Sequence, residues 1–316
     1  MFYPINSALG CLYGAACGDS LGAAVEFRSR IEILKDFGPS GISEPAPFQG
    51  FPAGSITDDT QQAIAIGQAL VSACLEGLTV EAISRAAWRT LKAWRATQEL
   101  PQQRRAPGHT SLTALDGDRR GSLADRLNDS DSCGAVMRVH PVGIAFAGQP
   151  DKAFAFGMAT AALTHGGEEA ILAAGTMAAI ISLISANRGP DEAFAGAVEI
   201  LEDHGDCRTL RLCRSALALP TDGERERHLA GLGKGWDAAE ALAIAIYAVR
   251  CHPGDFLAAV RLAVNHDGDS DSTGSLAGAI AGAYLGILAL PRDWCGRLER
   301  RSELARLATC LNGLEV

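Results

Sequence analysis

Small and aliphatic side chains recur at three- and four-residue spacing through most of this chain, which is the spacing of one face of an α-helix. Runs that alternate apolar and polar residues, as half-buried strands do, are scarce. We therefore predict an all-α fold. The predicted helices cover residues 60–77, 78–96, 151–165, 168–187, 191–205 and 236–252.

Residues 272–291 form an uncharged segment in which Gly274, Gly278, Gly282 and Gly286 stand at every fourth position. Small residues at this spacing also occur where membrane helices pack in pairs. However, the segment consists mostly of glycine and alanine, with few large apolar side chains. We therefore predict a buried helix that packs closely through its glycine face, and no membrane partner.

Proline and glycine mark loops at residues 38–54, 101–108 and 219–235. No low-complexity linker divides the chain, so we predict a single domain over residues 1–316, built as a compact orthogonal multi-helix bundle. We expect the polar stretch 98–131 to be a long surface excursion. Such excursions are often functional.

The composition indicates which classes of partner and which cellular compartment to expect. The chain of 316 residues carries 28 Lys and Arg against 37 Asp and Glu, a formal net charge of -9. This balance argues against nucleic acid or an anionic membrane as a partner. The nine cysteines are scattered and form no CxxC motif, which fits buried thiols in a reducing compartment. We expect a cytoplasmic monomer without a signal peptide.

Three aspartates, Asp267, Asp269 and Asp271, directly precede the glycine-rich segment. An EF-hand calcium loop would need Glu at its twelfth position, but the chain has Gly278 counting from Asp267 and Ile280 counting from Asp269. Helix capping accounts for one or two of the three acids. The repulsion among all three would reduce stability unless a cation offset it.

A second acidic group, Thr57, Asp58 and Asp59, precedes another predicted helix, where capping alone also explains it. Asp19 and Glu26 flank a run of small residues nearer the N-terminus. Carboxylates and hydroxyls without interleaved His or Cys favour hard cations such as Mg²⁺ or Mn²⁺. If these groups converge at one end of a helical bundle, they form a binuclear metal site at the helix mouths.

Four motifs in order carry a resemblance to a known family. GDSLGAAVEF, TDDT, SCGAVMR and GDSDSTGSLAGAIAGA, between residues 18 and 283, resemble the ADP-ribosylglycohydrolases. That family includes the dinitrogenase-reductase-activating glycohydrolase and the ADP-ribosyl-acceptor hydrolases. The resemblance implies an all-α domain with two Mg²⁺ or Mn²⁺ ions. The metal ligands that it implies are Thr57, Asp58, Asp59, Asp269, Asp271 and Ser272, the last standing where the family usually has Thr.

The resemblance also implies three catalytic residues: Glu26, Asp131 and Asp269. Glu26 would be a mobile acid that either moves aside for the substrate or acts as a base on water. Asp131 would act on the leaving group, and Asp269 would lie at the metals. Asp267 would be a capping or outer group, because many members have no acid at its position.

The loop DSDSCGAVMRVHPVG resembles the segment of the family that contacts ribose and phosphate. Its small residues would let backbone N–H groups approach a diphosphate. On the residues alone, Cys133, His165 and Trp236 fit packing roles as well as contact roles. The substrate-binding residues that the resemblance implies are Ser132, Cys133, Gly134, Ala135, Met137, His165 and Trp236.

The function implied is a metal-dependent hydrolase that removes ADP-ribose from modified proteins, most readily from arginine through its N-glycosidic bond. Its partners would be an ADP-ribosylated protein and free ADP-ribose. Two alternatives stay open: a hydrolase of serine-linked or free ADP-ribose derivatives, and a non-catalytic ADP-ribose-binding protein on the same fold. All the acidic residues that the resemblance implies for catalysis by the metals are present, which favours an enzyme over the non-catalytic protein. They are Glu26, Asp58, Asp59, Asp269 and Asp271.

Overall fold

The computed structural model describes residues 4–314, and within them the regular elements are all helices, with two isolated β-bridges and no strand. The α-helices are α1 (Pro4–Gly22), α2 (Arg30–Phe37), α3 (Asp58–Ala73), α4 (Val80–Thr97), α5 (His109–Asp116), α6 (His140–Ala145), α7 (Pro150–Ala161), α8 (Glu168–Ser185), α9 (Pro190–Glu202), α10 (Arg208–Ala218), α11 (Arg225–Ala230), α12 (Ala238–Cys251), α13 (Phe256–Val264), α14 (Ser270–Leu285), α15 (Arg292–Arg297) and α16 (Arg301–Asn312). Three short 3₁₀ helices are η1 (Cys74–Glu76), η2 (Cys133–Arg138) and η3 (Ile287–Ala289).

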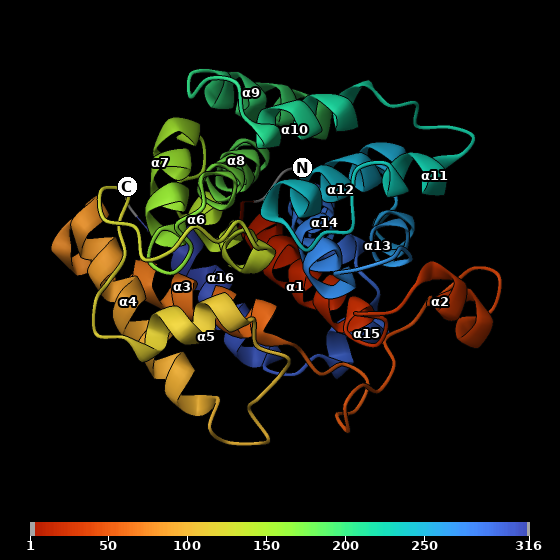
Figure 1. Ribbon diagram of the computed structural model, residues 1–316, viewed down its shortest axis with the longest axis horizontal. Coiled ribbons are helices and arrows are strands. Elements are labelled where there is room, and N and C mark those ends of the chain that lie inside the picture. The colour runs from red at the N-terminus through yellow and green to blue at the C-terminus, as the bar shows by residue number, and fades with distance from the viewer. Residues whose placement is uncertain (1–3, 315–316) are drawn as a thin grey trace.

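The centre of the fold is an antiparallel pair of helices from the two ends of the chain, α1 and α14 (Figure 1). A Cβ atom added to Gly14 would lie 2.2 Å from the carbonyl oxygen of Gly278. One added to Gly278 would lie 2.0 Å from the carbonyl oxygen of Gly14. The two backbones therefore touch, and only glycine fits. The same close approach joins Gly10 to Gly282 and Gly18 to Gly274.

This pairing confirms that the glycine-rich segment is a buried helix that packs through its glycines. One described helix, α8, is long and apolar enough to cross a membrane by length and composition alone. Of its 18 residues, 83% are buried inside the fold, among α6, α7 and α9. Burial of this extent is typical of a core helix.

The periodicity predicts helix positions to within a few residues. For example, the predicted helix 236–252 is α12, which begins at Ala238 because the Asp237 side chain accepts hydrogen bonds from the N–H groups of Ala239 and Glu240. The excursion 98–131 is not structureless, since it contains α5. That helix has only eight residues, and three of them are buried, so its periodic signal is weak.

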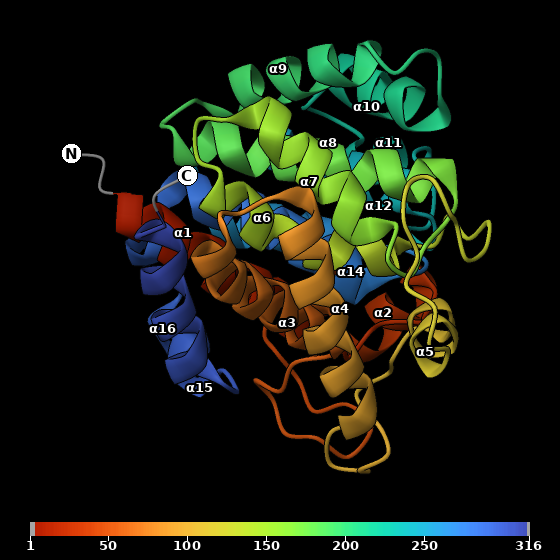
Figure 2. The ribbon, with the colours of Figure 1, turned by 90° about the vertical axis from the view of Figure 1, so that its left-hand side faces the viewer.

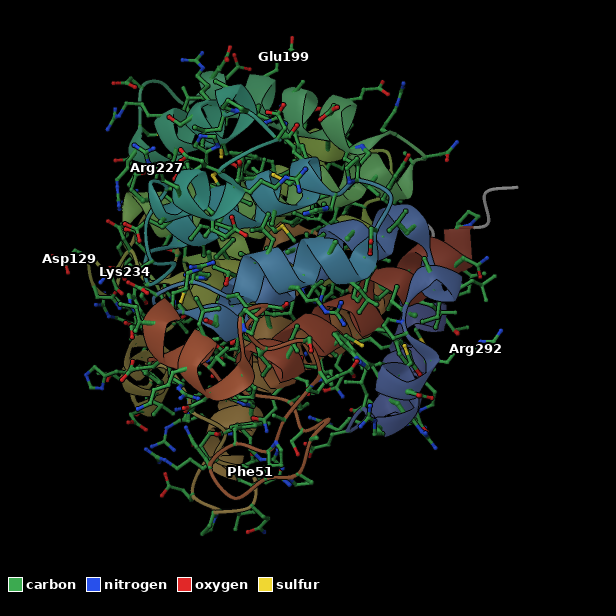
Figure 3. All side chains as sticks on the ribbon, turned by 90° about the vertical axis from the view of Figure 1, so that its right-hand side faces the viewer. Phe51, Asp129, Glu199, Arg227, Lys234 and Arg292 are labelled. Atoms are coloured by element: carbon green, nitrogen blue, oxygen red, sulfur yellow. The ribbon has the colours of Figure 1, made fainter. Side chains whose placement is uncertain are left out.

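The helix starts gather at one end of the central pair. The last turn of α1 meets the start of α3, where the Asp19 carboxylate accepts hydrogen bonds from the Thr57 N–H. Gly22 packs against Ser270 at the start of α14. Figure 2 shows α3, α4 and α5 on the side of the molecule away from α9 and α10. Charged side chains such as Glu199, Arg227 and Arg292 project outward from the surface (Figure 3).

Candidate active site

A cavity of about 330 Å³ opens where the helix starts meet. Most of the residues that the sequence nominates line it: Glu26, Asp58, Asp59, Ser132, Cys133, Gly134, Met137, His165, Trp236, Asp269, Asp271 and Ser272. The other wall comes from the excursion that we expected to be functional. It consists of the segment from Ala106 to Ser111.

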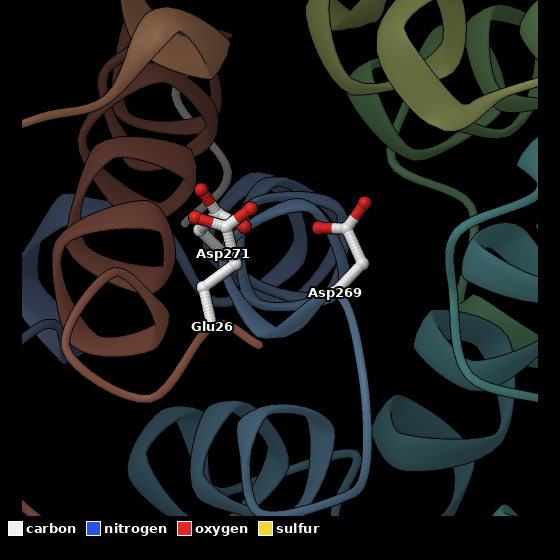
Figure 4. A group of neighbouring side chains, drawn as sticks. All are labelled: Glu26, Asp269 and Asp271. Carbon is white, nitrogen blue, oxygen red and sulfur yellow. The ribbon is translucent and has the colours of Figure 1, made fainter. Parts of the chain in front are cut away.

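Three carboxylates form the floor of the cavity. Glu26, Asp269 and Asp271 each offer an oxygen within 4.8 Å of the others' (Figure 4). Asp269 caps α14, where its Oδ1 accepts a hydrogen bond of 3.2 Å from the N–H of Ser272. Asp271 lies in the first turn of the same helix, and Glu26 follows the end of α1. Carboxylate oxygens this close together could hold a metal ion.

Two more carboxylates come from the start of α3, and both are almost fully buried. Asp58 is held in place by its neighbours: its N–H donates to the Arg105 carbonyl at 3.0 Å, and its Oδ2 accepts from Gln62 at 2.6 Å. Asp59 is different. Its buried Oδ1 has no hydrogen-bond partner within the described residues. A buried carboxylate oxygen without a protein partner is free to bind an ion or a water molecule.

The cluster is electrostatically unfavourable without a positive partner. Burial, and next the charge of Asp271, raise the pKa values of Asp58 and Asp59 well above the usual range. Burial and then Asp269 do the same to the pKa of Asp271. For Glu26, burial and the charges of Asp271 and Asp269 raise the pKa to about 11. A divalent cation would offset this repulsion, and the all-oxygen donor set fits Mg²⁺ or Mn²⁺.

The two hydroxyl residues predicted to bind metal occupy different places. Ser272 lines the cavity. Thr57 lies directly behind it as the cap of α3, where its Oγ1 accepts a hydrogen bond of 3.2 Å from the N–H of Asp59. Whether either hydroxyl binds a metal stays a prediction.

Asp19, which we did not predict to be a site residue, is completely buried behind the acidic cluster. Its carboxylate accepts hydrogen bonds from the N–H groups of Thr57 and Thr60 and from the Thr60 hydroxyl. Burial, and next Asp271, raise its pKa to about 7. Asp19 therefore ties α1 to the start of α3 and holds Asp58 and Asp59 in position. In the sequence, the one indication of this role is that Asp19 is a single acidic residue within an apolar segment.

The predicted substrate loop forms one wall of the cavity through η2. The Cys133 N–H donates to the Trp236 carbonyl at 3.1 Å, and the Ala238 N–H donates to the Asp131 carbonyl at 2.9 Å. These bonds fasten the loop to the start of α12. The Cys133 thiol reaches the cluster, with Sγ 2.6 Å from Asp269 Oδ2. Ala135, by contrast, is buried behind the wall and does not line the cavity.

Asp131 requires a correction. Its side chain does not line the cavity, because Oδ1 accepts hydrogen bonds from the N–H groups of Glu169 and Ala170 at 3.0 and 3.2 Å. The carboxylate thus caps α8 and is not placed to act on a leaving group. Asp267 behaves as expected for a capping group, accepting a 2.6 Å hydrogen bond from the Arg30 N–H at the start of α2.

Two aromatic side chains meet at the mouth of the cavity. Phe27 and Trp236 stack with their ring centroids 5.0 Å apart and an angle of 27° between their planes. They are 68% and 38% exposed, so Trp236 lies at the entrance and not in the core. Phe27 follows Glu26 directly and was not nominated by the sequence. Nothing local identifies it, because its partner is distant in the chain.

His165 lies inside the cavity wall and is 1% exposed. Its Nε2 is 3.0 Å from Ser132 Oγ, and its Nδ1 is 2.8 Å from Thr164 Oγ1. Burial, and next the charge of Arg138, lower its pKa well below the usual range. The imidazole is therefore neutral at physiological pH. The histidine combines a structural role with a position at the cavity.

Comparisons with known proteins relate the whole chain to one family. Residues 4–315 match the sequence model of the family described as ADP-ribosylglycohydrolase. The chain is 26% identical to the ADP-ribosyl-[dinitrogen reductase] glycohydrolase of Rhodospirillum rubrum, over 94% of this chain and 92% of that protein. It is 25% identical to an ADP-ribosylarginine hydrolase of Pseudomonas putida, covering 96% and 77%. It is 28% identical to the ADP-ribosylhydrolase ARH3 of Bos taurus, covering 96% and 91%.

A solved structure described as an ADP-ribosylglycohydrolase-related protein complex has the same fold, with a TM-score of 0.74 and 26% identity over 99% of both chains. The match of the family model spans nearly all of the sequence and includes every element of the acidic cavity. This chain belongs to the ADP-ribosylglycohydrolase family.

Proposed function

We propose that this chain is a metal-dependent hydrolase that releases ADP-ribose from modified protein side chains, with the N-glycosidic bond to arginine as its preferred target. Family membership supports hydrolytic removal of ADP-ribose. The observation that carries the proposal is the convergence of five carboxylates from three segments of the chain in one cavity, opposite the loop from Ser132 to Met137.

The proposed cofactors are two Mg²⁺ or Mn²⁺ ions. The residues that would hold them are Thr57, Asp58, Asp59, Asp269, Asp271 and Ser272. The raised pKa values and the unpartnered oxygen of Asp59 support this assignment. When bound, such ions would supply an activated water and hold the ribose hydroxyls. Asp269 would contribute to catalysis as one of these ligands.

Cleavage at the anomeric carbon of the ribose passes through an oxocarbenium-like state, and the attacking water must lose a proton. Glu26 is the proposed acceptor of that proton. Its carboxylate lines the cavity beside Asp269 and Asp271, and in the described part of the chain it has no hydrogen-bond partner to occupy it. The other acids are fixed by helix starts, whereas Glu26 lies in the turn after α1.

The remaining residues bind and shield the ligand in this proposal. Gly134 and Ser132 present the substrate loop to the diphosphate, and His165 supports Ser132 from behind. The stacked rings of Phe27 and Trp236 exclude water at the entrance. Exclusion of water strengthens electrostatic interactions inside the site.

The arginine linkage is tested by comparing acceptors. Metal-loaded protein is incubated with peptides that carry ADP-ribose on arginine or on serine, and released ADP-ribose is measured by chromatography. Faster release from arginine is the expected result. Faster release from serine would show that the protein is a hydrolase whose preferred linkage is to serine and not to arginine. ADP-ribose binding without release from either peptide would favour the non-catalytic alternative.

A further inference from the structure

Four polar side chains form a continuous line from the core to the cavity. Arg138 Nη2 lies 2.7 Å from Thr164 Oγ1, which lies 2.8 Å from His165 Nδ1. His165 Nε2 lies 3.0 Å from Ser132 Oγ, at the cavity wall. The first three residues are at most 1% exposed, so bulk solvent does not reach these contacts.

The direction of each hydrogen bond follows from the chemistry of the groups. An arginine side chain only donates, so the Thr164 oxygen accepts from Arg138. Within the described residues, the buried Thr164 hydroxyl has one acceptor for its own proton, His165 Nδ1. A neutral imidazole carries a single N–H, and because Nδ1 accepts, that proton is on Nε2. His165 therefore donates to Ser132.

This direction decides what Ser132 offers to the cavity. Its oxygen accepts from His165, so its proton is free for another acceptor. Ser130 Oγ, 3.2 Å away, also donates to the Ser132 oxygen. Among the described residues, the acceptor left for the Ser132 proton is Thr110 Oγ1, which is 3.5 Å away, at the limit of hydrogen bonding. In the opposite tautomer, Ser132 would donate to His165 and turn its lone pairs toward the cavity. Lone pairs at that place would repel an anionic ligand.

The same guanidinium orients a donor on the acidic side of the cavity. Arg138 Nη1 donates to Gln62 Oε1 at 2.6 Å, and Gln62 Nε2 donates to Asp58 Oδ2 at 2.6 Å. Because Arg138 binds the amide oxygen, the amide nitrogen must face Asp58. One buried side chain thus fixes hydrogen-bond directions on both walls of the cavity.

We propose that Arg138 is a positioning residue that, through Thr164, holds His165 as the Nε2–H tautomer, so that the Ser132 hydroxyl donates to a phosphate oxygen of the bound ligand. A deprotonated diphosphate only accepts hydrogen bonds, so a fixed donor suits it. The choice of a diphosphate ligand rests on the proposed function. The tautomer does not, because it follows from the protein's own contacts.

Thr164→Val tests the relay without removing the buried charge, since valine has the shape of threonine but no hydroxyl. Nothing then donates to His165 Nδ1, so the ring loses its preference for one tautomer. In ¹⁵N NMR of the ligand-free protein, we expect the two ring-nitrogen signals of His165 to move toward each other. A His165→Asn variant identifies these signals among the seven histidines. We expect the Kd for ADP-ribose, measured by calorimetry, to rise about 10-fold.

Two further variants serve as controls for Thr164→Val. Thr164→Ser keeps the hydroxyl and should restore both readouts. Thr176→Val removes another buried hydroxyl, whose one hydrogen bond among the described residues goes to the Leu172 carbonyl in α8, and should change neither readout. Wild-type ring signals or a wild-type Kd in Thr164→Val would overturn the proposal. If the wild-type protein bound no ADP-ribose, the proposed function would fail, and the NMR signals would still decide the relay.

Discussion

Glu26 differs from the other acids of the site because it is held by a turn and not by a helix start. As the proposed proton acceptor, it acts in the chemical step, whereas Asp271 belongs to the set that would hold the cations throughout. Glu26→Gln keeps the size of the side chain and removes its basicity. We expect turnover to fall by roughly 10²–10⁴-fold, as for a lost general base, with the ADP-ribose Kd nearly unchanged.

The matched variant is Asp271→Asn, which should weaken both metal binding and ADP-ribose binding. Calorimetry with Mn²⁺ and with ADP-ribose, beside single-turnover rates, separates the two cases. Equal loss of ligand binding in Glu26→Gln and Asp271→Asn would show that Glu26 is a permanent ligand and not a base.

Single residues were predictable where they stand in a motif at a helix start. Asp58, Asp59, Asp269 and Asp271 are examples, since the charge pattern and the predicted helix are both local. Asp19 was not, because its role depends on the approach of α1 to the start of α3. Contacts between segments far apart in sequence leave no local signal.

At the scale of helices, the α1–α14 pair depends on the absence of side chains. Gly14→Ala would place a Cβ atom 2.2 Å from the Gly278 carbonyl oxygen, so both backbones must separate. We expect the free energy of unfolding to fall by at least about 3 kcal/mol, the upper range for overpacking. Gly254→Ala is the control, because a Cβ atom there meets nothing within 4 Å. Urea unfolding curves that match for the two variants would contradict the packing account.

The same pair shows why some helices escape a sequence-based prediction. Amphipathic helices such as α4 have a polar face that makes the period visible. Helix α1 is buried on nearly all sides and consists largely of small residues, so it has little periodic contrast. Our prediction did not include α1, although it recognised the glycine face of α14.

At the scale of the whole molecule, the acidic cavity couples stability to pH and metal. Burial raises the pKa of Asp19 from 3.8 to about 7, and burial also raises the pKa values of Asp58, Asp59 and Asp271. The folded state thus binds protons more tightly than the unfolded state. The stabilisation that comes from protonating these carboxyls is complete below their pKa values in the unfolded state. It is lost as pH rises through their pKa values in the folded state.

We therefore expect the Tm of protein in EDTA to fall between about pH 5 and about pH 8, and this fall to shrink when Mn²⁺ is added. Asp19→Asn should remove part of the dependence around neutrality. A Tm in EDTA that is flat across this range, measured by calorimetry, would mean that the cluster is not electrostatically unfavourable.

In the proposed function, the carboxylates of the cavity hold the cations needed to release ADP-ribose. The most direct test is to strip the protein of metal and follow ADP-ribose release from an arginine-linked peptide while Mn²⁺ is restored. We predict no release without metal, recovery that saturates at two bound ions for each chain, and no recovery in Asp58→Ala. Release that persisted after complete removal of metal would contradict the account.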